Sequence, residues 1–119
     1  MADKNNGSRF NFNLRVTITG EEKFFGPGIA RLLHLVDEHG SIRSAAQIMD
    51  MSYSKAWKIL RRADKELGFP LLESKNGGDG GGKSRLTDEG RSFLEKYDSM
   101  DAELNEKGKE LLEKYFQAE

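Results

Sequence analysis

The pattern of hydrophobic and polar residues between Ser41 and Leu67 predicts two helices joined by a tight turn. Apolar residues recur there at spacings of three and four, which is typical of helices that bury one side. Ser41 and Ser52 stand where the two helices would begin, and serine is a favoured N-cap residue. The turn is expected at Asp50 and Met51. The residues predicted to be buried are Ile42, Ala45, Ala46 and Met49 in the first helix and Tyr53, Ala56, Trp57, Leu60, Ala63 and Leu67 in the second.

The opposite side of the second helix is polar and cationic. Its exposed positions are predicted to be Ser54, Lys55, Lys58, Arg61, Arg62 and Lys65. A short helix, a tight turn and a second helix with a polar, cationic face together form the pattern of a helix-turn-helix, whose second helix enters the DNA major groove. We expect this recognition helix at about residues 52–66.

The residues before this stretch predict a strand and a helix. Hydrophobic and polar residues alternate from Phe10 to Ile18, which predicts a strand with one buried face. Lys23-Phe24-Phe25 is expected to pair or pack briefly. A helix is expected from Pro27 to about His39, because proline suits the first helical turn and Gly40 can end the helix in the left-handed conformation. Residues 1–9 are polar, and we expect them to be disordered.

A β-hairpin is predicted directly after the second helix of the pair. Gly68 and Pro70 end that helix, and two short strand-like pieces then flank a glycine-rich tip at 76–82. A hairpin in this position is usually called a wing. We place it at about residues 71–86.

The last part of the chain predicts a long helix that begins after Thr87. Its apolar residues recur about every 3.67 residues, so one straight helix of about 28 residues would be about 42 Å long. So small a body cannot bury the whole stripe, and we expect the excess to pack on a second subunit. The alternative is that Gly108 divides the segment into two helices. The predicted dimer-interface residues are Phe93, Tyr97, Met100, Leu104, Leu111 and Tyr115.

Size and composition favour one small, mainly α-helical domain with a minor β component. Of the 119 residues, 36% are hydrophobic and 33% are charged. No run of about 18 apolar residues predicts a membrane helix, and the N-terminus lacks the apolar core of a signal peptide. With no cysteine there are no disulfides and no thiolate metal sites. We therefore expect a cytoplasmic protein with a winged helix-turn-helix domain at 10–86 and a dimerisation helix at 87–119.

The net charge of −1 hides a segregation of charge along the chain. Residues 1–40 are balanced, residues 41–86 hold nine Lys and Arg against five Asp and Glu, and residues 87–119 hold five against ten. The positive charge thus concentrates on the predicted helix-turn-helix and wing, which favours a nucleic-acid partner. The acidic last segment is expected to face away from a phosphate backbone.

Several short motifs resemble a known family of regulators. They are FGPG at 25–28, GSI-x-x-AA at 40–46, MSY-x-x-AW at 51–57 and GG-x-GGG-x-x-LT-x-x-G at 77–90. Together they make residues 25–97 resemble the N-terminal DNA-binding domain of the ModE family, the molybdate-dependent bacterial transcription regulators. The region is similar, more distantly, to the winged helix-turn-helix of LysR-type regulators.

The resemblance implies a winged helix-turn-helix that binds double-stranded DNA as a homodimer and regulates transcription. ModE proteins have C-terminal molybdate-binding domains after the long helix, whereas this sequence ends at Glu119. We therefore expect no molybdate site in this chain, and we favour a stand-alone DNA-binding protein over a fragment. Asp79 is an acidic residue at the wing tip, where a loop that faces phosphates would be expected to have a basic one.

Candidate DNA contacts come from three places: the start of the first helix of the pair, the exposed face of the second, and the wing. Lysine can donate to guanine O6 and N7, and basic residues further along can bind phosphates. The alternative for each is ordinary solvated surface, and Tyr53 suits either core or phosphate contact. We expect Trp57 in the core, with base stacking as the alternative. The candidate set is Arg43, Ser44, Ser52, Ser54, Lys55, Lys58, Arg61, Arg62, Lys75, Lys83, Ser84 and Arg85.

Other kinds of site find little support. Gly82-Lys83-Ser84 resembles the end of a nucleotide phosphate loop, but such a loop must follow a buried strand and lead into a helix, whereas this run lies in a predicted hairpin. His34 and His39 are five residues apart and poorly placed to share a metal. No catalytic set converges, so we expect neither an enzyme nor a cofactor. The alternative function is a winged-helix protein–protein adaptor that has lost DNA binding.

Overall fold

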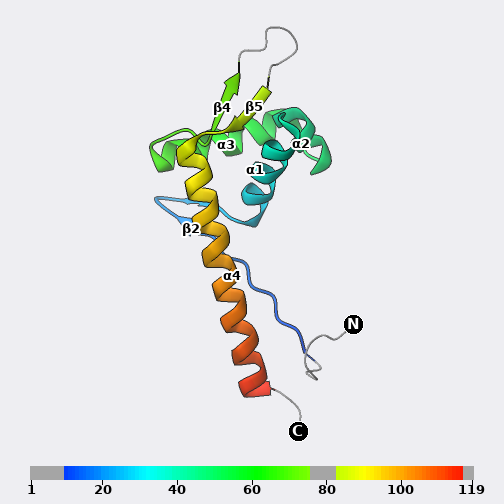
Figure 1. Cartoon of the computed structure of the whole chain (residues 1–119), viewed down its shortest axis with the longest axis vertical. Helices are drawn as coiled ribbons and strands as arrows, with labels where there is room; N and C mark the ends of the chain where they lie inside the picture. Colours follow the sequence, from blue (N-terminus) through cyan, green and yellow to red (C-terminus); the bar gives the residue numbers. More distant parts are fainter. Residues whose placement is uncertain (1–9, 76–82, 117–119) are drawn as a thin grey trace.

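The structure, a computed structural model, describes residues 10–75 and 83–116. A compact body of helices and two short hairpins sits at one end of a protruding helix, and the whole measures 62 × 32 × 23 Å (Figure 1). The elements are β2 (Ile18–Thr19), β3 (Lys23–Phe25), α1 (Pro27–His39), α2 (Ile42–Ile48), α3 (Tyr53–Leu67), β4 (Leu72–Lys75), β5 (Lys83–Leu86) and α4 (Asp88–Phe116). The mainly α-helical fold with a small β component is confirmed.

The helix ends are where local sequence signals predict them. Gly40 and Gly68 end α1 and α3 in the left-handed conformation, with φ of 73° and 85°. The Ser41 hydroxyl accepts from the Ser44 N–H at 3.0 Å, and the Ser52 hydroxyl accepts from the Lys55 N–H at the same distance. In the turn between α2 and α3, Asp50 takes a φ of 59°. These caps fix where α3 begins relative to α2.

The wing is an antiparallel hairpin of β4 and β5. Leu72 pairs with Leu86 and Lys75 with Lys83, so the register is continuous between the two strands. The Ser84 N–H also donates to the Gly40 carbonyl oxygen at 2.9 Å, which joins the hairpin to the α1–α2 connection. Residues 76–82, where the glycine-rich tip was predicted, lie outside the described residues.

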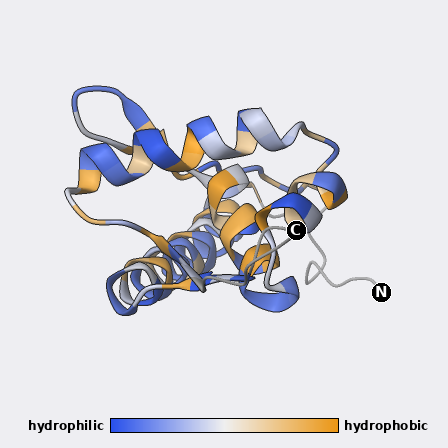
Figure 2. Ribbon diagram, turned by 90° about the horizontal axis from the view of Figure 1, so that it is seen from above, coloured by the Kyte–Doolittle hydropathy of each residue, from blue (hydrophilic) through white to orange (hydrophobic). Residues whose placement is uncertain are grey.

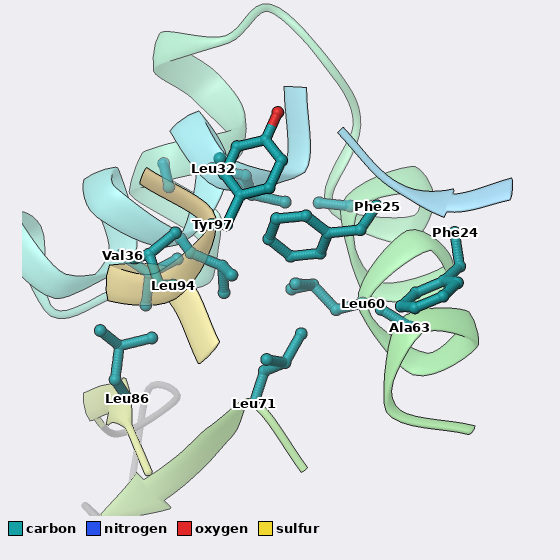
Figure 3. Packing of buried hydrophobic residues seen from close by; sticks show 14 of the residues in the cluster. Phe24, Phe25, Leu32, Val36, Leu60, Ala63, Leu71, Leu86, Leu94 and Tyr97 are labelled. Carbon is teal, nitrogen blue, oxygen red and sulfur yellow. The ribbon is translucent and has the colours of Figure 1, made fainter. Parts of the chain in front are cut away.

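The core forms where α1, α3, β3 and α4 meet. Phe25 is 1% exposed, and its ring packs edge-on against Phe93 and Tyr97, with centroids 4.8 and 4.9 Å apart. Figure 3 shows the rings of Phe25 and Tyr97 next to each other in this core. Seen from above, the helices surround a hydrophobic centre and place mostly hydrophilic residues on their outer turns (Figure 2). Leu33, Val36 and several neighbours are fully buried, so the body has one continuous core.

The start of α4 is fixed to the segment between α3 and the wing. The Thr87 hydroxyl accepts from the Gly90 N–H at 2.8 Å, which caps α4, and donates to the Pro70 carbonyl oxygen at 2.8 Å. The Thr87 N–H donates to the Leu71 carbonyl oxygen at 3.0 Å. An ion pair, Arg91–Asp37 at 3.1 Å, and a hydrogen bond between the side chains of His34 and Asp98 at 2.8 Å join its next turns to α1.

α4 is one unbroken helix of 29 residues, about 43 Å long. The alternative in which Gly108 divides it is therefore wrong. Gly108 instead has a packing role, because a Cβ built on it would lie 2.5 Å from a ring carbon of Phe12. Glycine there lets the N-terminal segment lie close against the helix.

The N-terminal strand is much shorter than the alternating pattern predicts. Only Ile18–Thr19 pairs, with β3, and residues 10–17 form no ladder within the described chain. Phe10, Phe12 and Leu14 are 36–47% exposed, so the predicted buried face is wrong for these three. A period-two pattern buries a face only when a sheet or another layer covers it. We call residues 10–17 the N-terminal arm.

The arm runs beside the protruding part of α4 (Figure 1). The Tyr97 hydroxyl donates to the Val16 carbonyl oxygen at 2.8 Å. At the other end of the arm, the rings of Phe10 and Phe116 meet edge to face at 6.5 Å. These contacts run in opposite order along the two segments, so the arm is antiparallel to α4. We call the arm and α4 beyond Tyr97 the stalk.

Candidate nucleic-acid interface

α3 buries a narrow face and exposes a broad cationic one. Ala56, Leu60 and Ala63 are at most 5% exposed, and two of them are alanines that let α3 lie close to the body. The far side includes Ser54, Lys55, Lys58, Arg61 and Lys65, all of which are exposed. The structure therefore brings together the predicted base-reading residues on one side of a single helix.

Trp57 and Tyr53 do not belong to the core. Trp57 is 44% exposed and Tyr53 is 40% exposed, so the prediction that their side chains are buried is wrong. Both residues lie on the flank of α3, next to the cationic face. The helical spacing misleads here because an apolar stripe can extend past the edge of the core, and sequence alone does not show where that edge lies.

Each of the two exposed rings is covered by a guanidinium group. The Arg61 guanidinium lies 4.8 Å from the centre of the Trp57 ring. The Arg43 guanidinium, from α2, lies 4.5 Å from the centre of the Tyr53 ring. Stacking of this kind orients a guanidinium while leaving its N–H groups available to an acceptor.

Other candidate residues already have partners. Arg62 forms an ion pair with Glu22 at 2.7 Å, and Arg85 forms one with Glu73 at 2.8 Å. All four side chains are well exposed, so these pairs are weak and can exchange a carboxylate for a phosphate. Lys55 and Lys58 form no ion pair with another residue of the described ranges 10–75 and 83–116.

The serines among the candidates have local structural roles. The Ser52 hydroxyl accepts a cap hydrogen bond, and the backbone N–H of Ser44 donates to the hydroxyl of Ser41; a serine hydroxyl that accepts in this way still has its own proton to donate. Ser44 is half-buried in the first turn of α2. In the wing, Lys83 is exposed and Ser84 is half-buried, while the side chain of Lys75 lies outside what the structure describes.

Two cations outside the predicted candidate set extend the positive surface. Arg15 and Lys23, with Lys58 and Arg62, line a hollow of about 360 Å³ between α3 and the β2–β3 hairpin. Only the folding of the N-terminal hairpin onto α3 brings these four side chains together. No local pattern in the sequence predicts that they come together.

Asp64 fixes the chain where it leaves α3. Its carboxylate accepts from the Leu71 N–H at 2.9 Å. Burial raises the pKa of this carboxyl group, while the hydrogen bond from Leu71 and the charge of Arg61 oppose the rise. This contact sets the position of the loop that leads into the wing.

The predicted dimer-interface residues fall into two groups. Tyr97 is 4% exposed and Phe93 is half-buried, because both pack on Phe25 within the same chain. Burial also raises the pKa of the Tyr97 hydroxyl. The other four, Met100, Leu104, Leu111 and Tyr115, are 40–66% exposed along the stalk.

The described residues form neither a metal-binding cluster nor a helix that could span a membrane. No group of three or more His, Cys, Asp or Glu side chains there is arranged to hold a metal ion. None of the described helices is long and apolar enough to cross a membrane.

The two capped helices, the adjoining hairpin and the exposed cationic face define the class. They form a winged helix-turn-helix of the DNA-binding type. Residues 30–91 match the family described as bacterial regulatory helix-turn-helix protein, lysR family. The chain belongs to this family, which consists of transcription regulators and not of enzymes.

Curated relatives agree with this assignment. The transcriptional regulator ModE of Haemophilus influenzae is 37% identical over 78 residues, which cover 66% of this chain and 31% of the relative. The molybdenum transport protein ModE of Azotobacter vinelandii is 34% identical over 73 residues, 61% of this chain and 27% of the relative. The DNA-binding transcriptional dual regulator ModE of Escherichia coli K12 is 30% identical over 98 residues, 82% of this chain and 37% of the relative. The chain thus matches about a third of the length of these relatives, and the predicted resemblance to ModE is confirmed.

Proposed function

We propose that this chain binds a specific double-stranded DNA sequence as a homodimer and so regulates transcription. α3 enters the major groove with Ser54, Lys55 and Lys58 toward the base edges, and the wing lies against the backbone or the minor groove. The main support is the exposed cationic face of α3, held by serine caps on a closely packed two-helix unit. Phosphate contacts supply affinity, and base contacts supply specificity.

The stalk supports the proposal of a homodimer. Its exposed apolar residues lie along a helix that protrudes from the body, and a second copy of the same stripe would cover them. Two α3 helices would then reach successive major grooves, about 34 Å apart, on a pseudo-palindromic site. This geometry also places the acidic α4 helices away from the DNA.

The double variant Lys55→Ala, Lys58→Ala tests the recognition face. Both side chains are exposed, so the fold and the melting temperature should not change. Loss of two contacts should weaken binding to a selected operator by about thirtyfold or more, since each contact contributes about 1–3 kcal/mol. Gel-shift titration measures the change on a duplex obtained by selection from a random pool.

Lys96→Ala is the matched control, because Lys96 is an exposed lysine on α4. It should bind as the unchanged protein does. Equal affinities for all three proteins would contradict the assignment of the recognition face.

The second candidate function is a protein–protein adaptor. The isoelectric point of about 6.2 and the ion pairs that occupy Arg62 and Arg85 favour it. A DNA-binding protein loses affinity steeply as salt rises, whereas an adaptor has little affinity for DNA at any salt concentration. The absence of a molybdate site in this chain stays a prediction.

A further inference from the structure

A row of two aromatic rings, each stacked against an arginine, lies along one flank of α3. Tyr53 and Trp57 are one helical turn apart, and the guanidinium groups of Arg43 and Arg61 cover their rings at 4.5 and 4.8 Å. A large aromatic side chain left about 40% exposed loses part of the favourable free energy of burial. Such residues on a protein surface commonly mark a place where a partner binds.

The row lies beside a groove between α3 and the wing. The groove has a volume of about 810 Å³, and Trp57 and Arg61 form part of its wall. The wall also includes Ile42, Lys65, Leu72 and Ser74. Apolar and cationic groups therefore both line the groove, next to the face of α3 that is proposed to read bases.

This chemistry matches one strand of a DNA backbone. Deoxyribose presents apolar C–H surface, and each phosphate presents anionic oxygens that a planar guanidinium can bind through two N–H groups. Asp64 is the acidic residue in the groove wall, and its Oδ1 is already engaged by the Leu71 N–H. A strand seated in this groove would meet Trp57 before it reached the wing.

We propose that Trp57 contacts DNA directly, with its indole ring against deoxyribose in the groove between α3 and β4 while Arg61, oriented by that ring, binds the adjacent phosphate. Arg43 on Tyr53 repeats the arrangement one turn earlier. The proposal rests on the proposed DNA-binding function and adds a residue that its apolar spacing had assigned to the core.

The fluorescence of Trp57 can be measured without interference, because it is the one tryptophan in the sequence. A labelled duplex of about 25 base pairs of mixed sequence, at about 50 mM salt, supports electrostatic binding without a known operator. Anisotropy of the label reports binding independently of the tryptophan. Quenching of the indole emission by acrylamide, a neutral quencher, should become at least about twofold less effective when the duplex is saturating, because the ring becomes covered.

A matched reporter shows whether any such protection is local. The variant Trp57→Phe, Phe116→Trp moves the tryptophan to an exposed position at the far end of α4, where Phe116 is 61% exposed. Its quenching should be the same with and without DNA. Protection at position 116 equal to that at 57 would overturn the proposal.

Substitutions separate a DNA contact from a structural role. Trp57→Ala should weaken duplex binding by about tenfold, Trp57→Phe should retain most of the affinity, and Arg61→Lys should weaken binding although the charge is kept. Circular dichroism melting should be nearly unchanged for all three variants. A large drop in melting temperature for Trp57→Ala would indicate a core residue and overturn the proposal.

The anisotropy and quenching measurements together distinguish a wrong assignment of Trp57 from a wrong proposed function. If anisotropy shows salt-dependent binding while quenching of Trp57 is unchanged, the contact is absent and DNA binding stands. If no duplex binds at low salt, both are overturned.

Discussion

At the scale of single residues, Gly90 decides how closely α4 can approach the body. It is buried in the first turn of α4, and a Cβ at this position would overlap the backbone carbonyl oxygen of Leu71. Backbone cannot move aside as a flexible side chain can. The glycine therefore permits the same close approach that lets Thr87 bond to Leu71 and Pro70.

Gly90→Ala should lower the free energy of unfolding by about 1–3 kcal/mol, the usual cost of overpacking a tight contact. Urea denaturation followed by circular dichroism measures the change. Gly28→Ala is the control, because Gly28 is an exposed residue in the first turn of α1 with nothing within 4 Å of a built Cβ. It should be neutral or stabilising, and a similar loss in both variants would refute the close-approach explanation.

Single residues also show which features of the structure can be predicted from the sequence. Caps at Ser41, Ser52 and Gly68 were predictable because their causes lie within a few residues of each other. The exposure of Trp57 was not, because it depends on where the core ends. The ion pair of Arg62 with Glu22 joins residues 40 positions apart, and periodicity holds no information about such a contact.

At the scale of elements, the arm and α4 depend on one another. Phe12 lies over Gly108, and Phe10 meets Phe116. The alternation from Phe10 to Ile18 is visible in the sequence, but the element that it packs on, α4, is not. A strand paired in a sheet and an extended arm that lies along a helix have the same alternating pattern. A glycine inside a long helix is the local sign of that close approach.

Gly108→Ala should therefore have an effect that depends on Phe12. In a Phe12→Ala background it should stabilise the protein by about 1 kcal/mol, the ordinary gain from replacing a helical glycine. In the unchanged background the gain should vanish or reverse, because the new methyl group meets the phenyl ring. Thermal unfolding of the four proteins at one concentration measures the coupling, and equal gains in both backgrounds would disprove the contact.

At the scale of the whole molecule, apolar exposure is unevenly distributed. Eight of the eleven large hydrophobic side chains that are exposed in the described residues lie on the stalk, and the other three are Ile48, Tyr53 and Trp57. The stalk set is Phe10, Phe12, Leu14, Met100, Leu104, Leu111, Tyr115 and Phe116. In a monomer this apolar surface would be exposed to water, whereas a homodimer would bury it.

Leu104→Glu with Leu111→Glu should give a monomer, because each would place an unpaired charge in the interface. Sedimentation velocity at micromolar concentration measures the mass. The control pair Ala102→Glu, Lys109→Gln changes the net charge by the same two units at exposed positions about half a helical turn from the stripe, and should leave the dimer intact. A monomeric unchanged protein, or a dimeric Leu104→Glu, Leu111→Glu variant, would exclude the stalk as the interface.

The contact between Phe10 and Phe116 brings the two ends of the described chain together at the tip of the stalk, far from α3 and the wing (Figure 1). Fluorophores attached near these two residues would form a donor–acceptor pair. Their energy transfer would follow the docking of the arm in real time without a label near the DNA.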